Sequence, residues 1–186
     1  VAQEVAIDLP AGPTELLIIA FGKFDEHFIA HDLVAQAEHS PWTVCGVVTD
    51  SATKSRRIVH ELNETVESAF RTEVVSEAIR RSFFVCVARN LSDAAEFANC
   101  FAPEHAQLMG SARFIAKDLK TSGLVLVGDY ASSAASDYTI GSNHILPTGG
   151  LARSYSGLSA RDFLRRQEIV SCTREGLGQI ACSAIR

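Results

Sequence analysis

The run "TELLIIAF" at Thr14–Phe21 is the stretch of sequence that decides the fold. It is entirely apolar after its first two residues, and it is bounded by "PAGP" at 10–13 and by Gly22. A short apolar run between turn residues is typical of a strand that is buried on both faces, as the strands of parallel sheets are. We therefore predict a buried strand at this point.

Strands and helices alternate along the chain after this run. The segment at 25–38 has apolar residues at helical spacing, and Ser51 is a suitable N-cap for the amphipathic segment that follows the second strand. Such alternation is the pattern of right-handed βαβ units, so we predict an α/β fold with a mostly parallel sheet flanked by helices. The expected helices are 25–38, 51–70 and 91–101, the last capped by Ser92 or Asp93, and the further strands are 42–50, 82–88 and 122–130.

The pattern changes after Tyr130. Residues 131–157 are rich in Ser, Gly and Ala and show little periodicity, which fits either a functional loop or a linker. Beyond them we expect a short helix at 159–166, a strand-like segment at 168–172 and a final helix at 173–186.

Composition excludes several classes of function. The 186 residues, 47% hydrophobic and 21% charged, predict one globular domain with at most a small appendage. The net charge of −5 and the absence of a basic stripe argue against a nucleic-acid partner, and the apolar runs are too short to span a membrane. The glycine patterns of dinucleotide and phosphate loops are absent. Five cysteines without metal or redox spacing predict free thiols in a reducing cytoplasm.

The segment "APEHAQL" at 102–108 places an acid and an imidazole side by side. Neighbouring side chains point to opposite faces of a strand, so Glu104 and His105 can face one ligand only where the backbone turns. Pro103 favours a helix start at this point, with Glu104 near the positive end of the helix dipole. Two interpretations therefore stay open, a surface helix opening and an acid–base pair that faces a common ligand.

Two further clusters could do chemistry. Gln36 and His39 share one helical face and could bind a metal, although a carboxamide is a poor ligand for zinc and a histidine can also interact with the last carbonyls of a helix. Asp137 and His144 lie in the irregular segment, where they either converge on one point or are ordinary solvated loop residues.

Five segments, taken in this order, closely resemble the histidinol dehydrogenase family. The similarity runs from about Val5 to the C-terminus and matches the latter part of a much longer family member. It implies an incomplete Rossmann-like α/β domain at 1–150 that carries most site residues, and a helical tail at 151–186 that packs on the partner subunit of a homodimer. The segments are "PAGPTE" (10–15), "AQAEHS" (35–40), "FAPEHAQL" (101–108), "SDYTIGSNHILPTGGLARSYSGLSARDF" (136–163) and "REGLGQIACSAIR" (174–186).

The resemblance implies an enzyme that uses zinc and NAD to oxidise L-histidinol to L-histidine through the aldehyde, at the end of histidine biosynthesis. Carried over residue by residue, Gln36, His39 and Asp137 fall on zinc-ligand positions that also contact the substrate. Glu104 and His105 fall on the catalytic acid–base pair. The family residues that contact the nicotinamide lie mostly upstream of this chain, so no NAD-binding residue is assigned.

Other positions carry further roles by the same resemblance. Thr14 stands where the family usually has a substrate-contacting serine, His144 falls near the substrate, and Glu175 matches a glutamate that holds the substrate's amino end in the partner's site. Ile180 stands where the family has its fourth zinc ligand, a histidine supplied across the dimer, and isoleucine cannot bind metal. Cys182 is a possible substitute ligand, but two residues turn a helix by about 200°, so it would face another way.

Two alternatives to an active histidinol dehydrogenase remain. The chain could be a non-catalytic relative, retained as a binding or interaction module, that has lost the zinc ligand at Ile180. It could also be a family member that oxidises a different polar alcohol, such as a sulfonated diol.

Overall fold

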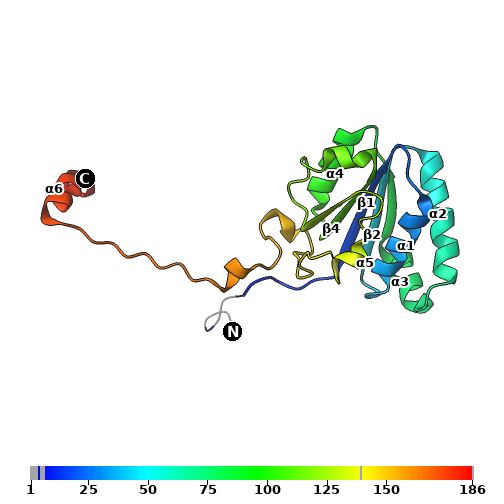
Figure 1. The fold of residues 1–186 in the computed structure, drawn as a ribbon, viewed down its shortest axis with the longest axis horizontal. Coiled ribbons are helices and arrows are strands. Elements are labelled where there is room, and N and C mark those ends of the chain that lie inside the picture. Colours follow the sequence, from blue (N-terminus) through cyan, green and yellow to red (C-terminus); the bar gives the residue numbers. More distant parts are fainter. Residues whose placement is uncertain (1–3, 5–6, 139, 186) are drawn as a thin grey trace.

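The computed structural model describes residues 4, 7–138 and 140–185. The predicted domain at 1–150 and the predicted helix at 173–186 each include residues outside this set. In the described part, parallel strands form one sheet in the order β3-β2-β1-β4-β5, with helices on both faces (Figure 1). The predicted α/β fold is confirmed. The strands are β1 (Glu15–Phe21), β2 (Val44–Thr49), β3 (Phe83–Val87), β4 (His105–Gly110) and β5 (Leu124–Val127).

The central strand β1 is buried along its whole length. Its side chains alternate between two cores, because Leu16 and Ile18 pack on one face of the sheet and Leu17 and Ile19 pack on the other. A strand covered on both sides needs an apolar residue at nearly every position. This requirement explains the continuous apolar run that predicted the strand.

Helices cover the sheet unequally. Side chains from α1, α2 and α3 build the core on one face, and side chains from α4 build the core on the other (Figure 1). The short α5 follows the sheet and lies against α1, and α6 stands apart. The helices are α1 (Glu26–Ala37), α2 (Ala52–Glu67), α3 (Thr72–Ser82), α4 (Leu91–Phe101), α5 (Ser133–Ser136) and α6 (Arg174–Ala184).

The interpretation of "APEHAQL" as a helix opening is wrong. Helix α4 ends at Phe101, its C-cap Ala102 adopts a left-handed conformation with φ of 55°, and the chain then extends into β4. That strand lies between β1 and β5. Its polar residues His105 and Gln107 are 3% and 0% exposed, so the strand lacks the apolar pattern by which a buried strand is recognised.

Several local predictions also need correction. Helix α3 was not predicted, although it buries Val75 and Ala78 in the core. The N-cap of α4 is Asn90, whose side chain accepts a hydrogen bond from the backbone of Asp93, and not Ser92 or Asp93 itself. Ser51 does cap α2 as predicted.

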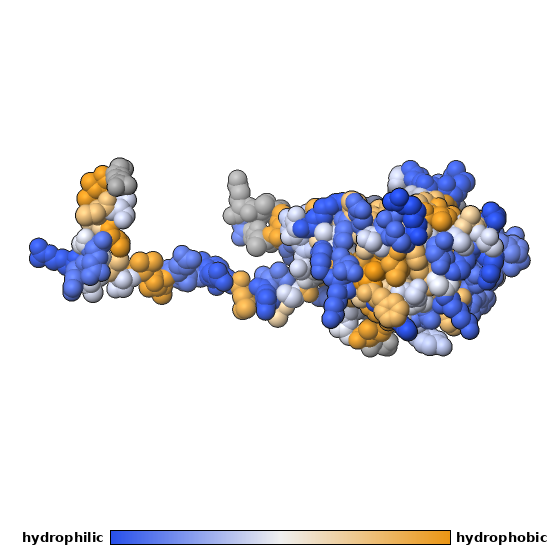
Figure 2. Space-filling view, turned by 90° about the horizontal axis from the view of Figure 1, so that it is seen from above, coloured by the Kyte–Doolittle hydropathy of each residue, from blue (hydrophilic) through white to orange (hydrophobic). Residues whose placement is uncertain are grey.

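The C-terminal tail makes little contact with the sheet. All side chains from 159 to 175 are exposed, and α6 stands well away from the α/β body (Figures 1 and 2). The predicted helix at 159–166 is only a 3₁₀ turn at Ala160–Phe163, and the predicted strand at 168–172 does not form, because no neighbouring strand is there to pair with it. Large apolar side chains are therefore left in solvent, among them Phe163, Ile169 and Val170.

Two smaller observations complete the fold. All five cysteines are free thiols, as predicted. None of the helices in the described residues combines the length and the apolar character that crossing a membrane requires.

Candidate active site

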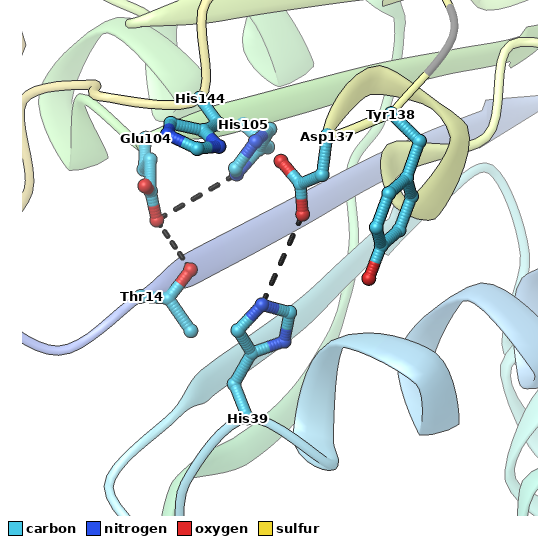
Figure 3. A pocket seen from close by; sticks show the side chains of 7 residues that line it. All are labelled: Thr14, His39, Glu104, His105, Asp137, Tyr138 and His144. Atoms are coloured by element: carbon cyan, nitrogen blue, oxygen red, sulfur yellow. Dashed lines mark hydrogen bonds and ion pairs between the residues drawn. The ribbon is translucent and has the colours of Figure 1, made fainter.

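A cavity of about 380 Å³ opens at the amino ends of β1 and β4 (Figure 3). The two strands are parallel neighbours whose register pairs Leu16 with His105, so the residues just before them also come together. The wall at Glu104 and His105 is buried, and the rim is formed by more exposed side chains from the segments that follow α1 and α5. The lining residues are Thr14, His39, Glu104, His105, Asp137, Tyr138 and His144.

Glu104 is held at the end of a chain of hydrogen bonds. Gln36 donates from Nε2 to Thr14 Oγ1 over 2.6 Å, and the Thr14 hydroxyl donates to Glu104 Oε2. The backbone N–H of Glu15 donates to the same carboxylate oxygen over 2.9 Å. The carboxylate of Glu104 therefore has a fixed position in the cavity wall.

The pKa values of two neighbouring carboxyl groups, Glu104 and Glu15, are shifted in opposite directions. Burial alone raises the pKa of Glu104, but the neighbouring His105 imidazole and the hydrogen bond from Thr14 outweigh it and bring the pKa below its ordinary value of 4.5. Burial raises the pKa of Glu15, and its backbone hydrogen bonds from Glu104 and Gly149 only partly oppose this. Such separation of two neighbouring acids is typical of sites that perform proton transfer.

His105 presents one free nitrogen. Its Nδ1 lies 3.3 Å from the backbone oxygen of Glu15 and 3.6 Å from Glu104 Oε2, and both of these atoms are acceptors. This arrangement favours the tautomer with the proton on Nδ1 and a lone pair on Nε2. Nε2 is buried and has no hydrogen-bond partner. The ring belongs to a residue that lines the cavity, and its Nε2 has a free lone pair.

His39 and Asp137 face each other at the rim (Figure 3). His39 Nε2 lies 3.9 Å from Asp137 Oδ2. Zinc bonds to imidazole nitrogen and carboxylate oxygen measure about 2.0–2.2 Å, so one ion could contact both groups. Gln36, the third predicted ligand, instead directs its amide nitrogen to Thr14. Within the described residues, no three His, Cys, Asp or Glu side chains gather closely enough to hold a metal.

A buried aspartate connects the elements that carry these groups. Asp32 on α1 accepts hydrogen bonds of 2.7 Å from Gln107 of β4 and from Ser132, just before α5. Gln107 lies two residues after His105 on its strand, and Asp32 lies one helical turn before Gln36. The Asp32 carboxylate thus fixes the position of α1 and of the loop before α5 relative to β4.

The remaining predicted residues are not in the cavity. Glu175 and Ile180 belong to α6, and Cys182 lies further along the same helix, where all three are exposed. Sequence reasoning missed Glu15 and Asp32. Glu15 is a charged residue at the start of a buried strand, and Asp32 lies on the same helical face as Gln36. Because buried charges require partners, these two positions were the signals that could have found them.

Comparisons with known proteins agree on one family. A model of the histidinol dehydrogenase family matches residues 1–186. Similar proteins include histidinol dehydrogenases from Methanococcus maripaludis, 36% identical over 94% of this chain and 41% of the relative, and from Methanosarcina mazei, 39% identical over 92% of this chain and 40% of the relative.

A solved structure has the same fold. The crystal structure of histidinol dehydrogenase from Elizabethkingia anophelis superposes with a TM-score of 0.88 at 31% identity, and the match covers 98% of this chain and 42% of that protein. The chain thus spans about two fifths of the length of the relatives that it matches.

The lowered pKa of Glu104 predicts a pH-dependent contribution to stability. The ionised form is favoured in the folded state, so the contribution is present above pH 4.5 and is lost as the pH falls through the folded pKa. We expect the free energy of unfolding of the natural chain to fall more steeply below pH 4.5 than that of the Glu104→Gln variant. Urea titrations at a series of pH values measure this difference.

Glu64→Gln is the matched control, since Glu64 is an exposed carboxylate on α2. It should keep the steep decline of the natural chain. If Glu104→Gln declines just as steeply, the carboxylate is not stabilised as the hydrogen bonds indicate.

Proposed function

This chain belongs to the histidinol dehydrogenase family, and from that premise we propose that it carries the acid–base site of an enzyme that oxidises L-histidinol to L-histidine through L-histidinal. One observation carries the proposal. His105 lines the cavity beside Glu104, whose pKa is lowered, and its buried Nε2 has no hydrogen-bond partner. A base with a free lone pair next to a second, separate acid suits a reaction with two proton transfers.

In the first oxidation, His105 acts as the general base. Its Nε2 takes the proton of the substrate hydroxyl as the alcohol is converted to the aldehyde. The positive charge that develops on the imidazole is stabilised by Glu104, whose Oε2 lies 3.6 Å from Nδ1. The backbone oxygen of Glu15 keeps the ring oriented.

In the second oxidation, Glu104 activates water. Its carboxylate accepts a proton from the water that attacks the aldehyde, which gives the hydrate that is oxidised to the acid. The hydrogen bond from Thr14 keeps one carboxylate oxygen occupied, so the other is the one available to water. We also propose that Thr14 and His144 contact the substrate, since both line the cavity.

We propose zinc and NAD as cofactors. His39 and Asp137 would hold zinc, because they face each other with one nitrogen and one oxygen donor, and Gln36 would complete the set contributed by this part of the chain. When bound, zinc lowers the pKa of the substrate hydroxyl and polarises the aldehyde, while NAD accepts a hydride in each oxidation. None of the described residues is assigned to NAD.

The tail supports a homodimer with shared sites. Its apolar side chains are exposed, and burying a Phe, Val or Ile side chain is worth roughly 1.5–3 kcal/mol, so they favour a second surface to pack on. We propose that residues 151–186 pack on a partner subunit and bring Glu175 to the partner's substrate. The five free cysteines support a cytoplasmic location for this assembly.

A non-catalytic binding module is the second candidate. The observation that favours it is Ile180, an apolar residue 56% exposed on α6, where a metal ligand is expected from the family resemblance. A module of this kind would bind L-histidinol without oxidising it. Turnover and binding therefore separate the two candidates.

Formation of NADH that depends on L-histidinol tests the proposal. We would assay this chain with excess zinc, alone and together with the remaining part of the Methanococcus maripaludis relative. His105→Gln should lower the rate of alcohol oxidation by about 10²–10⁴-fold, because general base catalysis is lost. Glu104→Gln should slow oxidation of added L-histidinal more than oxidation of L-histidinol.

His60→Gln is the control, because His60 is exposed on α2 outside the cavity. It should retain the full rate. Binding of L-histidinol without any turnover would instead favour the binding module, and equal loss of both oxidations in both variants would contradict the division of roles.

Ile180→His should improve zinc binding. If α6 reaches a partner's site, the new imidazole adds a direct zinc ligand. Loss of an outer hydrogen-bond partner costs about 10–100-fold in metal affinity, and we expect a direct ligand to change the affinity by at least as much. Competition with a zinc-binding dye measures the change. Cys182→Ala should leave the affinity of the natural chain unchanged. No gain in Ile180→His would show that the tail does not reach the site.

A further inference from the structure

Two histidines on the first turns of α1 lie outside the candidate active site. His27 and His31 are four residues apart and therefore stack on one face of the helix. Their Nε2 atoms lie 3.1 Å apart, and the rings meet edge to face with centroids separated by 4.4 Å. Neither residue lines the cavity at β1 and β4; Gln36 lies at the other end of the helix, and His39 lies just beyond that end.

A carboxylate from the neighbouring helix orients one of the rings. Glu61 Oε1 of α2 lies 2.6 Å from His27 Nδ1. Because a carboxylate is an acceptor, this contact favours a proton on Nδ1 and leaves the lone pair on Nε2, the atom that faces His31. Histidines that bind metals usually have their second nitrogen held by a carboxylate or carbonyl in this way.

We propose that His27 and His31 form a two-ligand site for a divalent transition-metal ion such as Zn²⁺ or Cu²⁺. Imidazole nitrogen is a preferred ligand of both ions. With metal–nitrogen bonds of about 2.0–2.1 Å, a separation of 3.1 Å between the two nitrogens gives an angle of roughly 100° at the metal. This value lies between octahedral and tetrahedral geometry, so one ion fits without separating the rings.

The surroundings leave the site open to ions from solution. His27 is 58% exposed, and Glu61 is 29% exposed. The nearby cation Arg57 is already paired with Glu26 over 2.6 Å. Within the described residues no group of three ligating side chains is present, so water or a ligand from another molecule completes the coordination.

A bound ion would link two turns of α1, and α2 is coupled to it through the hydrogen bond between Glu61 and His27. His27 and His31 belong to α1, and Glu61 belongs to α2, which packs beside α1 over the sheet. An ion that binds only the folded arrangement stabilises it by mass action. Ion binding would therefore stabilise α1 in this arrangement, and it does not depend on the proposed dehydrogenase activity.

The competing arrangement is a simple hydrogen bond. One imidazole can donate its N–H to the other across the same 3.1 Å, with no role for a metal. The two arrangements differ in what an added ion does. Two ligands on one helix act as a chelate, since the second binds within the same molecule, whereas a hydrogen-bonded pair gives no such gain.

Titration with Cu²⁺ tests the proposal directly. The reference is the 186-residue chain with His39→Ala, which removes one candidate active-site ligand, and with the exposed thiols Cys100, Cys172 and Cys182 changed to Ser, because Cu²⁺ oxidises free thiols. Isothermal calorimetry should show one ion bound, and electron paramagnetic resonance should show two imidazole nitrogens on it. Adding His31→Ala should weaken binding by about tenfold or more and leave a single imidazole. Glu61→Gln should weaken binding by about 10–100-fold with both imidazoles retained.

His60→Ala in the same reference chain is the matched control. His60 also lies four residues from a partner on its helix, but that partner is the carboxylate of Glu64. Its removal should change neither the affinity nor the spectrum. Circular dichroism confirms that each variant folds. If removing His27 or His31 changes Cu²⁺ binding no more than removing His60 does, the pair is only hydrogen-bonded and the proposal is wrong.

Discussion

The parallel pairing of β1 with β4 is the constraint on which the candidate site depends. Its register sets Leu16 opposite His105, so Glu15 and Glu104 lie side by side at the amino ends of these two strands. Each residue's backbone N–H donates to the other's carboxylate, over 2.9 Å and 3.2 Å. A slip of one residue in this pairing would turn every side chain of β4 to the opposite face. The acid–base pair is therefore a consequence of the sheet.

Buried charge organises the rest of the site. Asp32 sits between α1, β4 and the loop before α5, so the elements that carry the base and two candidate metal ligands share one carboxylate. Glu15 remains close to Glu104, but its pKa moves in the opposite direction, so Glu104 loses its proton at a lower pH than Glu15 does. The rim of the cavity is less completely built than its buried wall. His39 and Asp137 face each other without a third described ligand, and the tail that could supply one is exposed.

Sequence reasoning found the elements whose burial leaves a regular pattern. The apolar run of β1 and the periodic helix α1 were predicted close to their observed bounds. The strand β4 was missed because its polar residues, such as Gln107, are satisfied by partners distant in the sequence. The five short motifs led to Glu104, His105, His39 and Asp137, which do line one cavity. Glu15 was missed because only the strand register reveals its neighbour, and the strand predicted at 168–172 failed because an isolated segment has nothing to pair with.

The central claim is that His105 is a base whose Nε2 is free. Nitrogen-15 NMR of the labelled imidazole at neutral pH tests it most directly, because protonated and unprotonated ring nitrogens differ in chemical shift. We expect the neutral form of the ring to carry its proton on Nδ1 and to leave Nε2 unprotonated. A ring with the proton on Nε2 instead, in which Nδ1 is the unprotonated nitrogen, would contradict it.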